Sequence, residues 1–201
     1  MEALLQRPLI LASASPRRAE LLKFAGLDFT IIPSHIREMA EGAESPQDHV
    51  LRLSREKALP VSDRHPDACI LGADTIVVIE GELLGKPVDG PTAKQMLKKL
   101  SGRVHEVYTG FTVTTKTAQI LVSQAVRSLV AFRQIPDDEI AWYISTAEPY
   151  DKAGGYAVQG SGAFFIKEIH GSYTNVMGLP LCEVVDVLRE QNILTYSPIY
   201  R

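Results

Sequence analysis

The sequence lacks an excess of basic residues. Its 201 residues include 21 lysines and arginines against 24 aspartates and glutamates, which gives a formal net charge of −3. Binding to nucleic acid through bulk electrostatic attraction is therefore not expected. The chain also lacks a basic face interleaved with aromatic residues, so a nucleic-acid binder is the least favoured class. Any polyanionic ligand has to meet a local cluster of cations.

Cysteine is scarce. Only Cys69 and Cys182 occur, and they do not form the C-x-x-C spacing of a metal or redox site. Both stand in apolar surroundings, so we predict two buried free thiols in a reducing compartment. The histidines never occur at the spacing of metal ligands. These absences argue against a zinc centre and against cysteine-based redox chemistry.

Long apolar runs are missing as well. A stretch such as "TIVVI" (75–79) is far too short to cross a bilayer, and the N-terminus has no apolar run of signal-peptide length. We therefore expect a soluble, cytoplasmic protein. The chain also has no G-x-x-x-x-G-K-[ST] phosphate loop and no G-x-S-x-G nucleophile elbow, which leaves P-loop NTPases and serine hydrolases without support.

Apolar periodicity predicts a mixture of helices and strands. Helices are expected at 16–25, 46–60, 91–101, 136–146 and 174–190. Strands are expected at 8–13, 28–34, 107–115, 125–132 and 162–171, with two further β-rich runs within 68–87. Because strands and helices do not alternate strictly, we predict an α/β (mixed α+β) fold on a mixed, twisted sheet, as a single domain over 1–201. The long central hairpin could carry a second lobe and leave a cleft between the lobes.

The stretch "LILASASPRRAELLKFAG" (9–26) places two arginines at the start of a predicted helix. A strand leads into a small-residue turn, and Ser15 suits the helix N-cap. Cations are locally unfavourable there, because the N-terminus of a helix carries positive partial charge. The turn's backbone N–H groups, with Ser13, Arg17 and Arg18, would suit a phosphate. Two solvated arginines at the start of a surface helix are the alternative.

Two charged residues occur where the pattern is apolar. Asp74 lies between apolar strand segments in "LGADTIV" (71–77), where a carboxylate is costly to bury unless it binds a cation or performs proton chemistry. It could equally cap a turn, and Thr75 next to it could cap or contact a ligand. Lys57 lies on the apolar face of its predicted helix, so it either snorkels to solvent or points into a cleft toward an anion.

Three more polar positions complete the candidate site. Lys86 in "LLGKPVD" holds a rigid loop position between Gly and Pro, or is an ordinary surface lysine. The segment "EPYDKAGGYAVQG" (148–160) is glycine-rich and either hugs a ligand or is a simple flexible loop. Its Gln159 has the donor and acceptor needed to bind a base edge. Glu38 could supply a second carboxylate for a metal, although alone it would be an ordinary surface glutamate. Together these positions favour a small polyphosphate as ligand.

The chain resembles the Maf family of nucleoside triphosphate pyrophosphatases. The family's motifs occur in order over about residues 9–189, as "ASASPRRAELL", "REKA", "LGADTIV", "GKPVD", "MLKKLSGRVHEVYTG", "EPYDKAGGYAVQG" and "GSYTNVMGLPL". The resemblance implies an elongated α/β fold of inosine-triphosphatase-like architecture, with the active cleft between two lobes. It also implies hydrolysis between the α- and β-phosphates, with a divalent cation, Mg²⁺ or Mn²⁺.

The resemblance also implies roles for individual residues. Asp74 matches the family's proton acceptor, which activates the attacking water, and with Glu38 it would contact the metal. The positions near the triphosphate are matched by Ser13, Arg18, Lys57 and Lys86. The family often has further acids just before the position of Glu38, where this chain has "HIRE", and Arg37 there could weaken metal binding or shift the ligand role to another acid.

Three positions distinguish Maf sub-families. The dTTP/UTP pyrophosphatase type has "SPRR", "GADT" and "DKAG…QG", whereas the 7-methyl-GTP type tends to have "SPYRR", "GSDQ" and "CAGS…EG". With Arg17, Thr75 and Gln159, this chain resembles the dTTP/UTP type. The alternatives are the 7-methyl-GTP type and a nucleotide-binding regulator of cell division or septum formation with little turnover. The resemblance leaves a homodimer open.

Overall fold

The computed structural model describes residues 2–36 and 44–197, and the chain forms two compact units. The first unit comprises 1–74, 109–125 and 178–201, and the second comprises 75–108 and 126–177. Neither unit is therefore a continuous piece of chain. Three of the four unit boundaries fall inside long strands, which are β4 (Cys69–Ile79), β6 (Val104–Thr115) and β7 (Ile120–Phe132), and the fourth lies between Met177 and Gly178.

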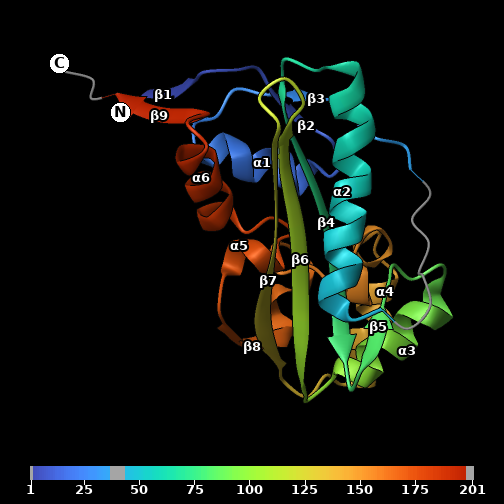
Figure 1. The fold of residues 1–201 in the computed structure, drawn as a ribbon. Helices are drawn as coiled ribbons and strands as arrows, with labels where there is room; N and C mark the ends of the chain where they lie inside the picture. The colour runs from blue at the N-terminus through green and yellow to red at the C-terminus, as the bar shows by residue number, and fades with distance from the viewer. Residues whose placement is uncertain (1, 37–43, 198–201) are drawn as a thin grey trace. The chain divides into compact units, whose positions relative to one another are not determined.

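The main sheet has the strand order β3-β2-β4-β6-β7-β8, and β5 pairs with β4 off this path. In the first unit, β2 (Leu9–Leu11) is parallel both to β3 (Thr30–Ile31) and to the start of β4. In the second unit, β5 (Glu82–Leu84) is antiparallel to β4, and β8 (Ile166–His170) is antiparallel to β7. The sheet is therefore mixed, and with its flanking helices it confirms the predicted α/β class (Figure 1).

Two helices belong to the parallel part of the first unit. Helix α1 (Pro16–Phe24) begins with proline in its first turn, and α2 (Pro46–Arg64) is capped by Ser45, whose hydroxyl accepts from the Asp48 N–H at 3.1 Å. Residues of α2 pack with β2 and β4 in one apolar cluster, which consists of Ile10, Ala12, Ala58, Val61, Ala68 and Ile70. Burial of this apolar surface holds the helix against the sheet.

A two-stranded sheet joins the two ends of the described chain. Strand β1 (Glu2–Leu5) is antiparallel to β9 (Leu194–Ser197), with Leu5 opposite Leu194, and α6 (Leu181–Glu190) leads into β9 (Figure 1). Both strands belong to the first unit. The sequence pattern did not predict this pair.

The second unit begins with a tight hairpin between β4 and β5. Glu80 and Gly81 both have positive φ, of 52° and 80°, as a two-residue hairpin turn requires. The helices are α3 (Gly90–Leu100), α4 (Asp137–Ile144) and the short α5 (Tyr173–Val176), with single 3₁₀ turns η1 (Glu148–Asp151), η2 (Ala153–Gly155) and η3 (Ser161–Phe165). The apolar core contains Val77, Ile79, Leu84, Leu97, Leu100, Val107, Val130, Phe132, Ile135, Ile140, Tyr143, Tyr156 and Phe165.

Several predicted boundaries are wrong. The strand expected at 162–171 is η3 followed by the shorter β8, and the strand expected at 28–34 is only Thr30–Ile31. The helix expected at 174–190 is broken into α5 and α6, because Gly178 has φ +109° and Pro180 follows it. Helix α2 continues to Arg64 across Pro60, since Val61 beyond it is fully buried in the core.

The two cysteines have different environments. Cys69 is buried on β4, as predicted, and burial raises the pKa of its thiol to about 12. Cys182 is exposed, which contradicts the prediction, because it lies on the side of α6 away from the buried Val184 and Leu188. Within residues 2–36 and 44–197, no helix combines the length and the hydropathy that crossing a bilayer requires.

Candidate active site

The turn between β2 and α1 is organised by Ser13 and Arg18. The Ser13 hydroxyl accepts from Nη1 of Arg18 at 2.9 Å and from the Ser15 N–H at 3.3 Å. Nε of Arg18 donates to the Gly178 carbonyl at 2.7 Å. Arg18 is only 9% exposed, so it is not a solvated arginine at the start of a surface helix. Arg17, its neighbour, is half-buried.

Lys57 and Asp74 form a buried ion pair in the first unit. Nζ of Lys57 lies 2.6 Å from Oδ1 of Asp74, and only 9% and 8% of the two side chains are exposed. A buried charge without a partner is costly, whereas a close, hydrogen-bonded pair compensates both members. Of the two alternatives for a lysine on the apolar helix face, snorkelling to solvent or pointing inward to an anion, the structure shows the second, with Asp74 as the anion.

Two glycines allow α2 to lie directly on the sheet. A Cβ on Gly72 would lie 2.4 Å from the Ser54 carbonyl oxygen, and a Cβ on Gly110 would lie 2.3 Å from the Val50 carbonyl oxygen. At these two glycines the α2 backbone therefore approaches β4 and β6 directly. Gly72 and Asp74 are two residues apart on β4 and share one face, so the same close contact brings Lys57 within reach of Asp74.

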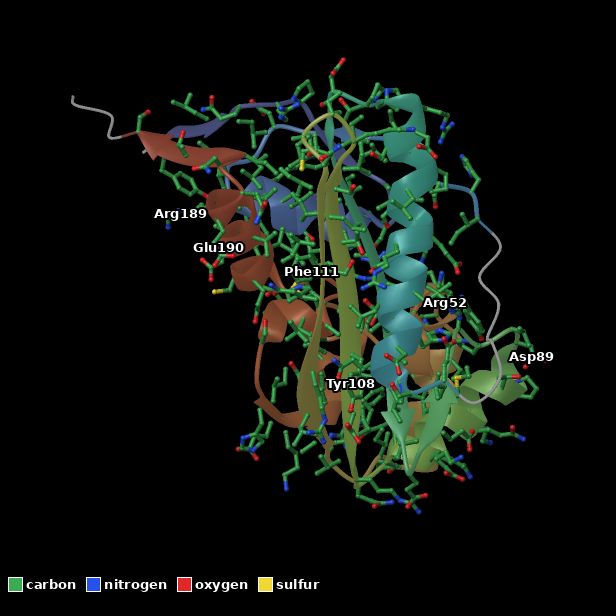
Figure 2. The ribbon with its side chains drawn as sticks, in the orientation of Figure 1. Arg52, Asp89, Tyr108, Phe111, Arg189 and Glu190 are labelled. Atoms are coloured by element: carbon green, nitrogen blue, oxygen red, sulfur yellow. The ribbon has the colours of Figure 1, made fainter. Side chains whose placement is uncertain are left out.

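The first half of α2 carries a second charged cluster, which the sequence analysis missed. Glu44 contacts Nδ1 of His49 at 2.5 Å and accepts from Arg52 at 2.6 Å, and Arg52 also donates to Glu56 at 3.1 Å (Figure 2 labels Arg52). The hydrogen bonds that Arg52 donates to Glu44 raise the pKa of Arg52, with desolvation opposing this effect in part and Glu56 adding to it. This cluster fixes the chain directly before the helix that holds Lys57.

The two predicted metal ligands are Asp74 and Glu38. Glu38, with Arg37 beside it, lies in the segment 37–43, outside the described residues. Over residues 2–36 and 44–197, no group of three or more His, Cys, Asp or Glu side chains is placed to hold a metal ion. Of the two proposed metal ligands, Asp74 and Glu38, only Asp74 lies within the described residues.

The remaining predicted residues lie in the second unit. Lys86 and Gln159 are exposed, and Thr75 is half-buried on β4. The loop of Lys86 contacts the glycine-rich segment, since the Gly154 N–H donates to the Gly85 carbonyl at 2.9 Å. A Cβ on Gly154 would lie 3.0 Å from Val77, so this position needs glycine both for its φ of +70° and for the close contact. The structure therefore brings the Lys86 loop and the glycine-rich segment together.

Glu148 is a residue of this segment that the sequence analysis did not single out. Its carboxylate accepts from the Ser161 N–H, the Gly162 N–H and the Tyr143 hydroxyl, each at 2.8 Å. Burial alone would raise the pKa of Glu148, but these three donors hold it below its ordinary value. Its backbone donors, Ser161 and Gly162, follow directly after the motif "EPYDKAGGYAVQG" (148–160), so nothing within the motif distinguished Glu148 from an ordinary acidic loop residue.

A tyrosine of the same segment contacts a buried histidine of β6. Nε2 of His105 is 2.8 Å from the Tyr156 hydroxyl, and both rings pack edge-on against Phe132. Burial lowers the pKa of His105 to about 4 and raises the pKa of Tyr156. Both groups are therefore neutral near pH 7, which suits a structural role in the core.

Comparison with known proteins shows extensive similarity. The model of the family described as Maf-like protein matches residues 8–191. The dTTP/UTP pyrophosphatase of Syntrophus aciditrophicus is 60% identical over 194 residues, which cover 96% of this chain and 95% of the relative. Proteins of the same name from Geotalea uraniireducens and Citrifermentans bemidjiense are 50% and 51% identical, over 92% and 90% of this chain and 96% and 94% of their own lengths. The resemblance inferred from the motifs is confirmed, and the chain belongs to the Maf family.

Proposed function

We propose that this chain hydrolyses dTTP and UTP to the nucleoside monophosphate and pyrophosphate. The single observation that carries the proposal is its 60% identity, over nearly the whole chain, to a dTTP/UTP pyrophosphatase. The residues of the dTTP/UTP pattern, "SPRR", "GADT" and "DKAG…QG", are all present in the sequence. A nucleotide substrate implies access to the intracellular nucleotide pool, so we also propose a cytoplasmic location.

Asp74 is the proposed general base. In-line attack of water at the α-phosphorus requires removal of a proton as the new P–O bond forms, and a carboxylate within reach can accept it. The bond from Lys57 at 2.6 Å fixes the Asp74 carboxylate in one orientation. Because Lys57 carries a full positive charge on a three-donor ammonium, it would also stabilise the negative charge that develops on the phosphate oxygens.

The other cations are proposed to bind the triphosphate. Arg18 and Ser13 shape the β2–α1 turn through their mutual bond of 2.9 Å, and such a turn before a helix suits phosphate oxygens. Lys86, exposed on its loop, would add charge for the departing pyrophosphate. These side chains bind and orient a tetra-anionic ligand in a chain whose net charge is −3.

A divalent metal, Mg²⁺ or Mn²⁺, is part of the proposal. Mg²⁺ in phosphate chemistry is commonly held by one or two carboxylates together with substrate oxygens and water. Asp74 fits this limited requirement and would hold the ion together with the triphosphate, with Glu38 as the proposed second carboxylate. When bound, the metal would neutralise charge on the phosphates and lower the pKa of a coordinated water.

Nucleotide preference is proposed to depend on Arg17, Thr75 and Gln159. The amide of Gln159 offers one donor group and one acceptor, which is what a pyrimidine edge requires. Gln159 is exposed, which leaves its amide accessible to a base.

A nucleotide panel tests the proposed function. The protein is incubated with dTTP, UTP, dCTP, GTP and 7-methyl-GTP, in Mg²⁺ or in Mn²⁺, and the products are separated by chromatography. We expect monophosphate and pyrophosphate in equal amounts, fastest from dTTP and UTP. Release of orthophosphate, or a preference for 7-methyl-GTP, would contradict the proposal, and tight triphosphate binding without any product would favour a regulator of little turnover.

A further inference from the structure

The side chains of Tyr143 and Glu148 hold the backbone on both sides of Gln159, in the loop of residues 157–162. Tyr143 is on the last turn of α4, and Glu148 begins η1. The Tyr143 hydroxyl accepts from the Ala157 N–H at 3.2 Å, two residues before Gln159. Glu148 accepts from the N–H groups of Ser161 and Gly162, which are two and three residues after Gln159, at 2.8 Å each.

The two side chains act as one unit. The Tyr143 hydroxyl donates to Oε1 of Glu148 at 2.8 Å, so it is a donor on one side and an acceptor on the other. Tyr143 is fully buried, with its ring edge-on against Phe165, and therefore has a fixed position. We refer to Tyr143 and Glu148 as the loop clamp.

The loop is shaped to accept this clamp. Gly160 has φ 138° and ψ −159°, a conformation that only glycine adopts readily. A Cβ at Gly160 would lie 2.6 Å from Oε2 of Glu148, so the close approach of the carboxylate also requires glycine. A Cβ at Gly162 would likewise lie 2.7 Å from the Tyr143 hydroxyl. The absence of side chains at these two positions lets the clamp reach the backbone.

The clamp contacts are strong relative to ordinary loop contacts. Bonds from N–H groups to an ionised carboxylate are about twice as strong as bonds between neutral partners. Lys152 supports the same turn by donating to the Glu148 carbonyl at 2.7 Å. An exposed loop without such contacts would sample several backbone conformations and would lose conformational entropy on binding a ligand.

We infer that Glu148, supported by Tyr143, is a positioning residue that presents Gln159 to the nucleotide base and thereby sets substrate preference. The inference rests on the proposed function, because it assigns to Gln159 the role of contacting the base. Glu148 itself need not touch the substrate. Its effect is to order the loop before binding, so its loss weakens recognition of the preferred base and leaves the chemical step at Asp74 intact.

Two conservative substitutions test the inference. Glu148→Gln removes the charge and one of the two acceptor oxygens, and Tyr143→Phe removes the hydroxyl while keeping the ring that packs on Phe165. For each variant, kcat and KM are measured for dTTP, UTP and dCTP. We expect KM for dTTP and UTP to rise by about tenfold, the effect of losing roughly one strong hydrogen bond, while kcat changes by less than about twofold.

The second unit offers a matched control. Glu106 also accepts from a tyrosine hydroxyl, that of Tyr108 at 2.6 Å, and from Arg127, yet none of these contacts involves the loop (Figure 2 labels Tyr108). Glu106→Gln and Tyr108→Phe remove the same groups as the test substitutions. We expect both controls to keep the wild-type KM for every nucleotide. A similar rise of KM in the controls would contradict the inference.

A combination with Gln159→Ala separates the inference from the proposed function. If the clamp acts through Gln159, adding Glu148→Gln to Gln159→Ala should change the preference for dTTP over dCTP no further. A wild-type protein without dTTP or UTP hydrolysis would refute the proposed function itself. A wild-type protein that hydrolyses both, while Glu148→Gln keeps its preference, would overturn only the inference. Should Glu148→Gln fail to fold, Tyr143→Phe decides in the same way.

Discussion

Removing the Lys57 ammonium is expected to destabilise the protein strongly, because it leaves the Asp74 carboxylate buried without its cation. The two groups are 2.6 Å apart and their side chains are less than one-tenth exposed. Breaking a buried ion pair from one side costs about 3–5 kcal/mol. For a chain of this size that corresponds to a decrease in Tm of about 6–20 °C. Lys57→Met, which keeps the length of the stem, is the suitable variant.

The same reasoning predicts that a second substitution reverses part of the loss. Asp74→Asn should destabilise the wild-type protein, since it takes from Lys57 its charged partner. In the Lys57→Met background it should instead raise Tm, because it removes a buried charge that no longer has a cation. The four proteins form a double-mutant cycle, which is measured by thermal and denaturant unfolding.

The sign of the Asp74→Asn effect decides the outcome. If Asp74→Asn lowers stability by the same amount in the wild-type protein and in the Lys57→Met variant, the side chains of Lys57 and Asp74 do not interact energetically. The argument from the buried pair would then be refuted, and Lys57 would have to be placed in the site for another reason. Activity should be lost in every variant that contains Asp74→Asn, whatever its stability.

Three further predictions concern the base, the glycine contact and a buried histidine. Asp74→Asn should lower kcat by about 10²–10⁴-fold with the fold retained by circular dichroism, and near-wild-type turnover would remove Asp74 from the role of base. Gly72→Ala should lower the free energy of unfolding by about 1–3 kcal/mol and reduce activity, because the added Cβ would lie 2.4 Å from the Ser54 carbonyl oxygen. Gly90→Ala is the control: its Cβ would lie 3.6 Å from the Tyr150 hydroxyl, so stability should be nearly unchanged. Burial lowers the pKa of His105 from 6.5 to about 4, so the unfolded chain takes up the proton first and stability should fall by about 3 kcal/mol as the pH decreases from 6.5 to 4. The His105→Phe variant should lack this loss of stability at low pH. If its stability depends on pH as that of the wild-type protein does, the loss does not come from His105.

The sequence drew attention to two residues of the proposed site, because each breaks a local pattern. Lys57 lies on an apolar helix face and Asp74 lies between apolar strand segments, so each is conspicuous within a window of a few residues. Their pairing is a tertiary contact between α2 and β4. This contact depends on the absence of a Cβ at Gly72 and Gly110, where the α2 backbone lies close to the sheet. A sequence pattern does not distinguish a glycine required by such a close helix contact from a glycine required by a turn. The role of these two glycines was therefore missed.

Contacts between a side chain and a distant backbone group were equally hard to predict. Glu148 looks like an ordinary acidic loop residue, because its partners at 161 and 162 are backbone N–H groups that any sequence would supply. The strand expected at 162–171 failed for a related reason. Its apolar residues are ones that a strand would use, but η3 occupies the first half and Phe165 packs on Tyr143 instead. Tertiary packing decided the local conformation there.

The pairing of β1 with β9 bears on how the chain folds during its synthesis. Residues 2–5 are synthesised long before residues 194–197, the strand that satisfies their backbone groups. The first unit cannot be completed until the segment from 178 onward has been synthesised, whereas all residues of the second unit have been synthesised by residue 177. The second unit can therefore reach its native packing before β9 is synthesised, while β1 still lacks its partner strand.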